Sequence, residues 1–370
     1  MFTARIGDLF TSRAQTLVNT VNCVGIMGKG VAQKFKTLYP AMFDDYAKRC
    51  TKQEVRLGEP YSYYHSSDLV IVNFPTKNHW RSSSRLSDIE AGLNHFVENY
   101  KEWGVKSVAF PPLGCGNGGL EWAEVGPLMF RLLGHLDIEV EVYAPYGTPA
   151  QQLSIEFLGK PYQLGLAGKG RTFEKLNSEW VILIEVLREL EKQPYANAVG
   201  RTIFQKICYV MTEMGVNTGF EFSKGSYGPF ADEVKDALHV FANRNWIQEE
   251  RLGKMLALRV GKQYESERSR YADVIGRHQR KIEKAVDLFS RIKNTDQAEE
   301  VLTVLFASRQ LKKASPEQDI AEQQLLEFIL DWKKAWRTEE KKQALANVIR
   351  NLVILGWMRL TFSQSLPDTT

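Results

Sequence analysis

The 370-residue sequence has only four cysteines and six histidines, and they form no metal-binding or disulfide pattern. Cys23, Cys50, Cys115 and Cys208 lack the CxxC spacing of zinc and redox motifs. The histidines form no HxxxH pair. We therefore expect neither a metal site nor a disulfide framework.

Long hydrophobic runs and a strong charge imbalance are also missing. No apolar run approaches the roughly 20 residues that a membrane-spanning helix needs, and the first residues lack a signal-peptide pattern. The formal net charge of +4 is too small to indicate nucleic-acid binding by itself. These absences predict a cytoplasmic protein without a membrane partner, and the length favours two domains.

Two glycine-rich loops, far apart in the sequence, are the most informative feature that is present. The first contains Gly28 and Gly30, and the second runs from Gly114 to Gly119. Each follows a β-type apolar segment, at 16–18 and 107–110, and precedes a helical pattern. Ligands bind α/β sheets beyond the carboxyl ends of the strands, and helix N-termini favour anions. No Lys-Ser/Thr follows the glycines, so the pattern predicts a metal-free diphosphate site rather than a Walker ATPase.

Polar residues accompany these loops. Asn19 and Asn22 precede the first loop, and Lys77 follows a buried-type strand that Pro75 is expected to break into a loop. Taken alone, Lys77 is typical of a solvated loop cation, and the asparagines are typical of side chains that stabilise a loop. His79, beside Trp80, is a possible proton relay but is more typical of a structural or substrate-packing residue.

These motifs follow the order found in macrodomains, and residues 1 to about 150 resemble that ADP-ribose-binding α/β module. Within this family they are most similar to the DarG group of antitoxins, which remove ADP-ribose from DNA. The resemblance covers about two fifths of the chain. It implies a mixed sheet between helices, and it implies no cofactor.

The resemblance also implies residue roles. Asp8 would accept a hydrogen bond from the adenine amino group, with the Leu9 backbone beside it. Lys77 and Asn22 would be catalytic, stabilising an oxocarbenium-like centre while water attacks it. The implied ADP-ribose-binding residues are Asp8, Leu9, Thr20, Val21, Asn22, Gly28, Gly30, Val31, Gly114, Cys115, Gly116, Asn117, Gly118 and Gly119.

One departure concerns the related terminal ADP-ribose-protein glycohydrolase, which shares the Thr-Lys pair at Lys77. That enzyme carries an acid in its second loop, whereas this chain has no carboxylate there before Glu121. A pathway in which Lys77 is a nucleophile assisted by a nearby acid is therefore less well supported than direct attack by water.

The sequence after the first domain changes character. We expect a macrodomain at 1–155, a glycine-rich linker at 156–171 and a mainly helical second domain at 172–370. Helical spacing of apolar residues is found at 180–187 and 204–211, and again in a later group of residues: Leu302, Leu305, Ile329, Trp332 and Trp336. The charges at 268–293 are interleaved in sign, which is typical of a solvated helix.

A segment at 220–230 resembles the YwgA/Panacea-type antitoxin domain. It contains a Phe220-x-Phe222 pair read as a strand, a Tyr227-Gly228-Pro229 turn and then a short helix. The alternative is an ordinary turn with Tyr227 packed in the core. The resemblance implies that this half binds a toxin protein, DarT, and blocks it.

Together these features predict an antitoxin. Its first domain would hydrolyse ADP-ribose from DNA bases, with thymidine in single-stranded DNA as the expected substrate, and its second domain would bind DarT. Two alternatives stay open. One is a macrodomain hydrolase acting on protein-linked or acetylated ADP-ribose, and the other is a non-catalytic ADP-ribose reader with a toxin-binding domain.

Overall fold

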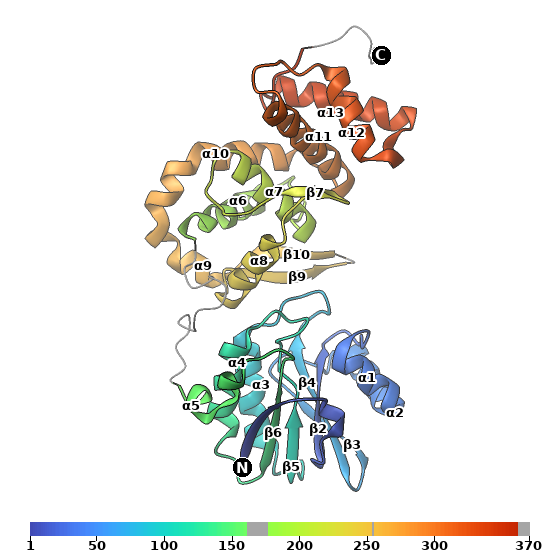
Figure 1. Ribbon diagram of the computed structural model, residues 1–370, viewed down its shortest axis with the longest axis vertical. Coiled ribbons are helices and arrows are strands. Elements are labelled where there is room, and N and C mark those ends of the chain that lie inside the picture. Colours follow the sequence, from blue (N-terminus) through green and yellow to red (C-terminus); the bar gives the residue numbers. More distant parts are fainter. Residues whose placement is uncertain (161–176, 254, 362–370) are drawn as a thin grey trace. The chain divides into compact units, whose positions relative to one another are not determined.

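The computed structural model describes residues 1–160, 177–253 and 255–361 (Figure 1). The chain divides into two compact units, formed mostly by the residues before and after the undescribed segment 161–176. Most of the expected linker at 156–171 therefore lies outside the described residues. Its first residues belong to a short helix, α5 (Ile155–Leu158), which packs on the first unit through Leu158.

A six-stranded mixed sheet forms the centre of the first unit. The strand order is β1-β6-β5-β2-β4-β3, and every neighbouring pair is parallel except β3 and β4. The strands are β1 (Phe2–Ile6), β2 (Thr16–Asn22), β3 (Tyr61–Ser66), β4 (Leu69–Lys77), β5 (Ser107–Phe110) and β6 (Glu139–Ala144). The strands expected at 16–18 and 107–110 are confirmed as β2 and β5.

Helices cover both faces of this sheet (Figure 1). Side chains alternate between the faces along each strand, so Leu17 joins the core beneath α1 and α2 while Val18 joins the core beneath α3 and α4. The helices are α1 (Gly30–Leu38), α2 (Pro40–Thr51), α3 (Leu86–Asn99) and α4 (Trp122–Leu133), with the short η1 (Leu9–Thr11) and η2 (Ala150–Leu153). The α/β architecture expected from the sequence is confirmed.

The expectation that Pro75 ends the fourth strand is wrong. β4 continues through Pro75 to Lys77, and its pairing with β2 shifts register between Val21 and Asn22. Proline has no N–H to donate to a ladder and is found in sheets at edges and bulges. The shift places Lys77, rather than Thr76, opposite Asn22.

The second unit is mainly helical, as expected, and its small β element consists of two antiparallel hairpins. Its helices are α6 (Val181–Glu191), α7 (Arg201–Glu213), α9 (Lys262–Glu267), α10 (Ala272–Ser290), α11 (Thr295–Ala314), α12 (Glu322–Trp332) and α13 (Glu339–Ile354), with η3 (Ser178–Trp180), η4 (Arg268–Tyr271) and η5 (Lys334–Trp336). The hairpin strands are β7 (Ser223–Gly225) with β8 (Gly228–Phe230), and β9 (Ile247–Leu252) with β10 (Met255–Val260). The chain also forms α8 (Glu233–Asn243) between the hairpins.

The structure corrects two interpretations of the 220–230 segment. The Phe220-x-Phe222 pair is not a strand, because β7 begins at Ser223 and the two rings instead pack against Trp180 and Tyr209. Tyr227 is not a core residue, since 69% of it is exposed. The turn therefore presents its aromatic side chain outward.

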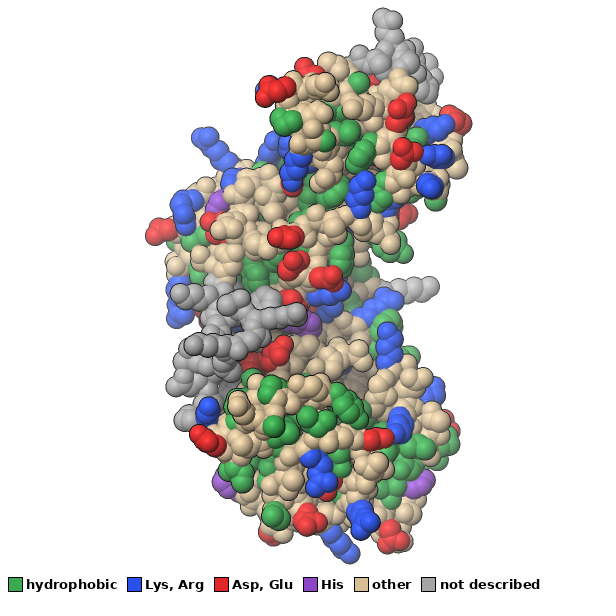
Figure 2. All heavy atoms as spheres, in the orientation of Figure 1, with side chains coloured by type: hydrophobic (Ala, Val, Ile, Leu, Met, Phe, Trp, Pro, Cys, Tyr) green, Lys and Arg blue, Asp and Glu red, His purple; other side chains and the backbone are tan. Residues whose placement is uncertain are grey.

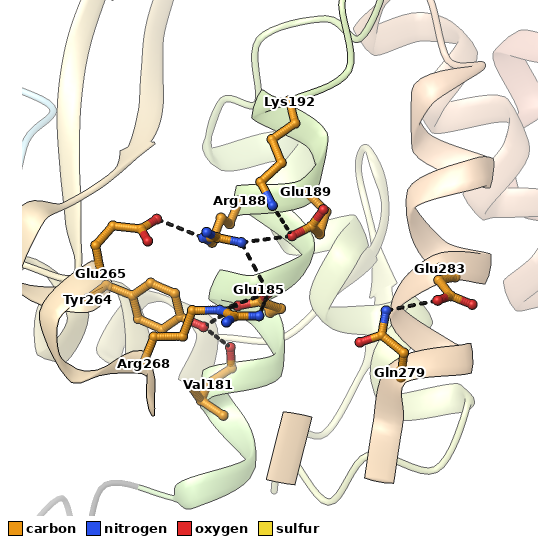
Figure 3. A network of polar contacts seen from close by, with 10 residues as sticks. All are labelled: Val181, Glu185, Arg188, Glu189, Lys192, Tyr264, Glu265, Arg268, Gln279 and Glu283. Carbon is orange, nitrogen blue, oxygen red and sulfur yellow. Dashed lines mark hydrogen bonds and ion pairs between the residues drawn. The ribbon is translucent and has the colours of Figure 1, made fainter. Parts of the chain in front are cut away.

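A buried carboxylate organises the interior of the second unit (Figure 3). Glu185 on α6 is 2% exposed and accepts hydrogen bonds from Arg268 Nε and Nη2 and from the Tyr264 hydroxyl, at 2.7 to 3.1 Å. Arg188 lies 3.5 Å from the same carboxylate. This arrangement joins α6 to α9 and η4, and it satisfies a charge that burial would otherwise penalise.

Acidic and basic side chains are interspersed over the face shown in Figure 2. This agrees with the small net charge read from the sequence. Within the described ranges, no helix combines the length and apolar character that crossing a membrane would require.

Candidate active site

The carboxyl ends of β2, β4 and β5 meet at one edge of the first sheet, because the three strands are parallel neighbours. Asn22 and Lys77 end two of these strands, and the second glycine loop follows the third. The first loop follows Asn22 and leads into α1 at Gly30. The tertiary structure therefore brings together motifs that are about 90 residues apart in the sequence.

The two glycine loops approach each other closely. A Cβ added at Gly30 would lie 3.8 Å from the Asn117 side-chain nitrogen of the second loop. Gly30 has a φ of +61°, a left-handed conformation that favours glycine. Gly28, Gly30, Gly116, Asn117 and Gly119 are exposed residues.

The second loop is compact at Gly118. A Cβ there would lie 2.3 Å from Ser84 Oγ and 2.4 Å from the Gly114 carbonyl oxygen, whereas a Cβ at Gly116 would meet no heavy atom within 4 Å. The Gly118 carbonyl accepts a hydrogen bond from the Ser84 backbone N–H at 2.9 Å. Gly118 therefore sets the shape of the loop, and Gly116 is its open part.

Lys77 connects β4 to this second loop. Its Nζ donates a hydrogen bond to the Asn117 carbonyl oxygen at 2.6 Å. The ammonium therefore lies at the glycine loop, and the Lys77 backbone pairs with Asn22 in the register of β2 and β4.

Asn22 is engaged within its own loop. Its Oδ1 accepts from the backbone N–H groups of Val24 and Ile26, at 3.0 and 3.3 Å, and its Nδ2 donates to the Ile26 carbonyl at 2.6 Å. The Tyr46 hydroxyl donates to the Asn22 carbonyl at 2.7 Å. These bonds match the loop-stabilising role that asparagine commonly has, and they fix the start of the first loop.

Asp8 lies beyond β1 at the start of η1. One carboxylate oxygen accepts from the Phe10 backbone N–H at 3.1 Å, and the other lies 2.7 Å from Lys34 Nζ on α1. The Lys34 hydrogen bond, followed by the Phe10 bond, lowers the pKa of Asp8, so the group is a carboxylate at neutral pH. An ionised, acceptor-only group is what an adenine amine requires.

Other residues that the resemblance implied as ligands have side chains directed partly or wholly into the protein. The side chains of Leu9 and Val21 are buried in the core beneath α1 and α2, and Thr20 and Val31 are half-buried. Asn19 is fully buried and donates from Nδ2 to Asn73 Oδ1 at 2.9 Å. Asn19 is therefore a structural residue between β2 and β4.

The cysteines near the site are unsuited to nucleophilic chemistry. Burial, with a smaller effect of the Glu121 carboxylate, raises the pKa of the Cys115 thiol. Burial raises the pKa of Cys23 to about 12. A thiol that stays protonated is a poor nucleophile, so Cys115 fits its tight loop as a small side chain. Among the described residues, no group of three or more metal-ligating side chains occurs.

Sequence reasoning missed several residues that shape this site. Lys34 pairs with Asp8, Tyr46 holds Asn22, and Ser84 supports Gly118. Lys34 and Tyr46 lie on helices with ordinary amphipathic patterns, so nothing in their spacing marked them. Only the packing of α1 and α2 against β2 brings them to the loops.

The second unit holds a second candidate surface around its first hairpin. Lys206 Nζ donates to the Tyr227 carbonyl, and Lys333 Nζ donates to the Ser226 carbonyl and pairs with Glu299 at 2.6 Å. Burial lowers the pKa of Lys206 to about 8, against the opposing effect of Glu299. Two lysines thus fix the turn from which Tyr227 projects.

A cavity of about 480 Å³ lies beside this turn in the second unit. Its lining combines cations with two indole rings and the turn itself: Lys224, Gly225, Ser226, Glu299, Trp332, Lys333, Lys334, Ala335 and Trp336. We call Tyr227 and these residues the hairpin surface. Its aromatic residues Tyr227, Trp332 and Trp336 are of the kind that is enriched in protein interfaces.

Comparison with known proteins places the first unit in a family. Residues 18–129 match the family described as Macro domain. The chain is 34% identical over 242 residues to a DNA ADP-ribosyl glycohydrolase of Mycobacterium tuberculosis, covering 64% of this chain and 66% of the relative. The alignment therefore leaves about a third of that relative's length unmatched.

A second relative is named as a fusion of two enzymes. A DNA ADP-ribosyl transferase-DNA ADP-ribosyl glycohydrolase fusion protein of Thermosipho africanus is 44% identical over 172 residues, or 41% of this chain and 44% of the fusion. Among solved structures, the macrodomain of Mycobacterium tuberculosis DarG is 44% identical, with a TM-score of 0.38, covering 39% of this chain and 98% of that one.

Proposed function

Since residues 18–129 are a Macro domain and the chain is a homologue of the DNA ADP-ribosyl glycohydrolases, we propose that it removes ADP-ribose from DNA bases. The single observation that carries this proposal is the position of Lys77, whose ammonium lies at the second glycine loop beside the strand end at Asn22. The expected substrate is ADP-ribosylated thymidine in single-stranded DNA, from which the base would emerge most readily.

The proposed reaction is hydrolysis of an N-glycosidic bond. A water oxygen bonds to the anomeric carbon of the distal ribose, the bond from that carbon to the base nitrogen breaks, and the base nitrogen receives a proton. The Lys77 cation would hold the distal ribose in place and orient the attacking water. Asn22 acts as a positioning residue, because its carboxamide fixes the loop that follows β2.

The glycine loops would bind the diphosphate. Gly28 and Gly30 are exposed at the start of α1, where N–H donors favour anions, and Gly116 is exposed in the loop that precedes α4. Asp8 would accept from the adenine amine.

The two alternatives predict different substrates. A hydrolase of protein-linked ADP-ribose would release ADP-ribose from a modified peptide, and a reader would bind ADP-ribose without cleaving either substrate. Release of free ADP-ribose from an ADP-ribosylated thymidine oligonucleotide, but not from a modified peptide, supports the proposal. Cleavage of the peptide alone, or of neither, contradicts it.

We also propose that the second unit binds and inhibits the transferase toxin, DarT. Support comes from the fusion relative, whose name joins a transferase to a glycohydrolase in one chain. The hairpin surface is the proposed contact, because its turn is held by Lys206 and Lys333 and projects an exposed aromatic ring. In this proposal residues 1–155 form the hydrolase and residues 172–370 the toxin-binding domain, joined by 156–171.

A further inference from the structure

The loop that follows Lys77 carries an exposed aromatic residue. Trp80 lies three positions after Lys77, between β4 and α3, and 46% of it is accessible to solvent. Tryptophan buries much apolar surface when it packs, so its exposure beside a proposed catalytic group needs an explanation. The proposed glycohydrolase reaction does not use this side chain.

Trp80 contacts two other planar groups of the same loop, and 46% of the residue stays exposed. The His79 ring lies 5.4 Å from the Trp80 ring at an interplanar angle of 29°, and the Arg81 guanidinium lies 4.4 Å from the Trp80 centroid. We call His79, Trp80 and Arg81 the stacking platform. An indole ring with a guanidinium on it offers both apolar area and positive charge.

Backbone bonds fix the stacking platform relative to Lys77. The Arg81 N–H donates to His79 Nδ1 at 3.2 Å, and the Ser82 N–H donates to the His79 carbonyl at 2.9 Å. The Cys23 N–H donates to the Asn78 carbonyl at 3.1 Å, which ties the loop to the end of β2. These bonds hold the loop backbone and the His79 ring in place, and so set where the Trp80 and Arg81 side chains begin.

The chemistry of the platform fits single-stranded nucleic acid. Proteins bind such strands by stacking bases on aromatic side chains and by placing cations near the phosphates. The diphosphate and distal ribose of the substrate are accounted for by the glycine loops and Lys77, so the platform is left for the strand itself. Asp8, the proposed adenine partner, lies after β1 and not on this loop.

We propose that the stacking platform binds the DNA strand next to the modified base, with a neighbouring base on Trp80 and a phosphate at Arg81. This inference rests on the proposed glycohydrolase function and adds a substrate subsite to it. The platform would make the enzyme prefer an ADP-ribosylated strand over an isolated ADP-ribosylated nucleoside.

The test compares two substrates in the full chain. Trp80→Ala is expected to raise KM about tenfold or more for an ADP-ribosylated thymidine oligonucleotide, since each stacked base contributes strongly to strand affinity. KM for ADP-ribosyl thymidine and the affinity for free ADP-ribose should stay within twofold. Trp80→Phe should bring KM for the oligonucleotide most of the way back to the wild-type value. Tyr64→Ala, at an exposed aromatic residue on β3, should leave KM for both substrates unchanged.

Two results would overturn the subsite. If Trp80→Ala raised KM equally for the oligonucleotide and the nucleoside, Trp80 would belong to the reaction centre that both substrates share. If it lowered the affinity for free ADP-ribose, Trp80 would belong to the ADP-ribose site. A direct measurement separates this inference from the glycohydrolase proposal. Even if the wild-type chain cleaved neither substrate, Trp80→Ala should weaken binding of an unmodified, labelled single-stranded oligonucleotide about tenfold, and unchanged binding would refute the platform.

Discussion

The Lys77 ammonium donates a 2.6 Å hydrogen bond to the Asn117 carbonyl, forty residues later in the chain. Lys77 ends β4, and Asn117 belongs to the glycine loop that follows β5. Because β4 and β5 flank β2 in the sheet, this contact spans the carboxyl end of the central strand. It joins the proposed catalytic cation to the proposed diphosphate loop.

Replacing Lys77 should separate catalysis from binding. Lys77→Ala is expected to lower turnover of an ADP-ribosylated oligonucleotide by about a hundredfold, as misplacement of the reacting groups typically does. Affinity for free ADP-ribose should change by less than tenfold, measured by calorimetry. The control is Lys106→Ala, an exposed lysine before β5 and so at the opposite edge of the sheet. A fully active Lys77→Ala protein would remove the catalytic assignment.

The second glycine loop offers a matched pair of substitutions. Gly118→Ala should destabilise the first unit by about 1–3 kcal/mol and weaken ADP-ribose binding, because the new methyl group overlaps Ser84 Oγ and the Gly114 carbonyl. Gly116→Ala should leave stability within about 0.5 kcal/mol, since its methyl group enters open space. Chemical denaturation of both variants measures the difference, and equal stabilities would contradict the loop geometry.

Toxin binding should depend on the exposed turn of the hairpin surface. Tyr227→Ala in the full chain is expected to weaken association with the DarT toxin about tenfold or more, as aromatic anchors at interfaces often do. Tyr195→Ala is the control, because Tyr195 is 92% exposed in the same unit but lies away from the hairpin in sequence. Co-purification and titration of the two proteins give the measurement. Equal affinities for the two variants would exclude the hairpin surface as the contact.

The buried carboxylate in Figure 3 predicts a pH dependence of stability. Burial raises the pKa of Glu185, but the hydrogen bonds from Arg268 and Tyr264 outweigh it and hold the pKa below its ordinary value. A carboxyl group with a depressed folded-state pKa stabilises the fold above its unfolded pKa of about 4.3, and this contribution is lost as pH falls through the folded value.

Glu185→Gln should therefore lower the melting temperature at pH 7, and the gap to the unmodified chain should narrow as pH falls below about 4. The control is Glu250→Gln, whose carboxylate pairs with Arg259 but is 54% exposed and so contributes little. Thermal unfolding between pH 7 and pH 3 gives the comparison. A gap that stays constant down to pH 3 would show that the charge of Glu185 is not the stabilising feature.

Some features of this protein follow from the sequence alone. The β-type apolar segments at 16–18 and 107–110 predicted two strands, and the glycine loops after them placed a candidate ligand site at the carboxyl edge of the sheet. The helical spacing of apolar residues at 180–187 and 204–211 located α6 and α7. These are local patterns, set by side-chain periodicity and by the backbone freedom of glycine.

Other features were decided by the tertiary structure. Pro75 was expected to end β4, but pairing with β2 carries the strand on to Lys77 and, through the bulge, sets that residue opposite Asn22. Tyr227 faces outward because two lysines from distant segments, Lys206 and Lys333, hold the carbonyls of its turn. The periodicity of apolar side chains predicts local helices and strands. The contacts that fix a bulge or a turn come from residues far away in the chain, so no local pattern shows them.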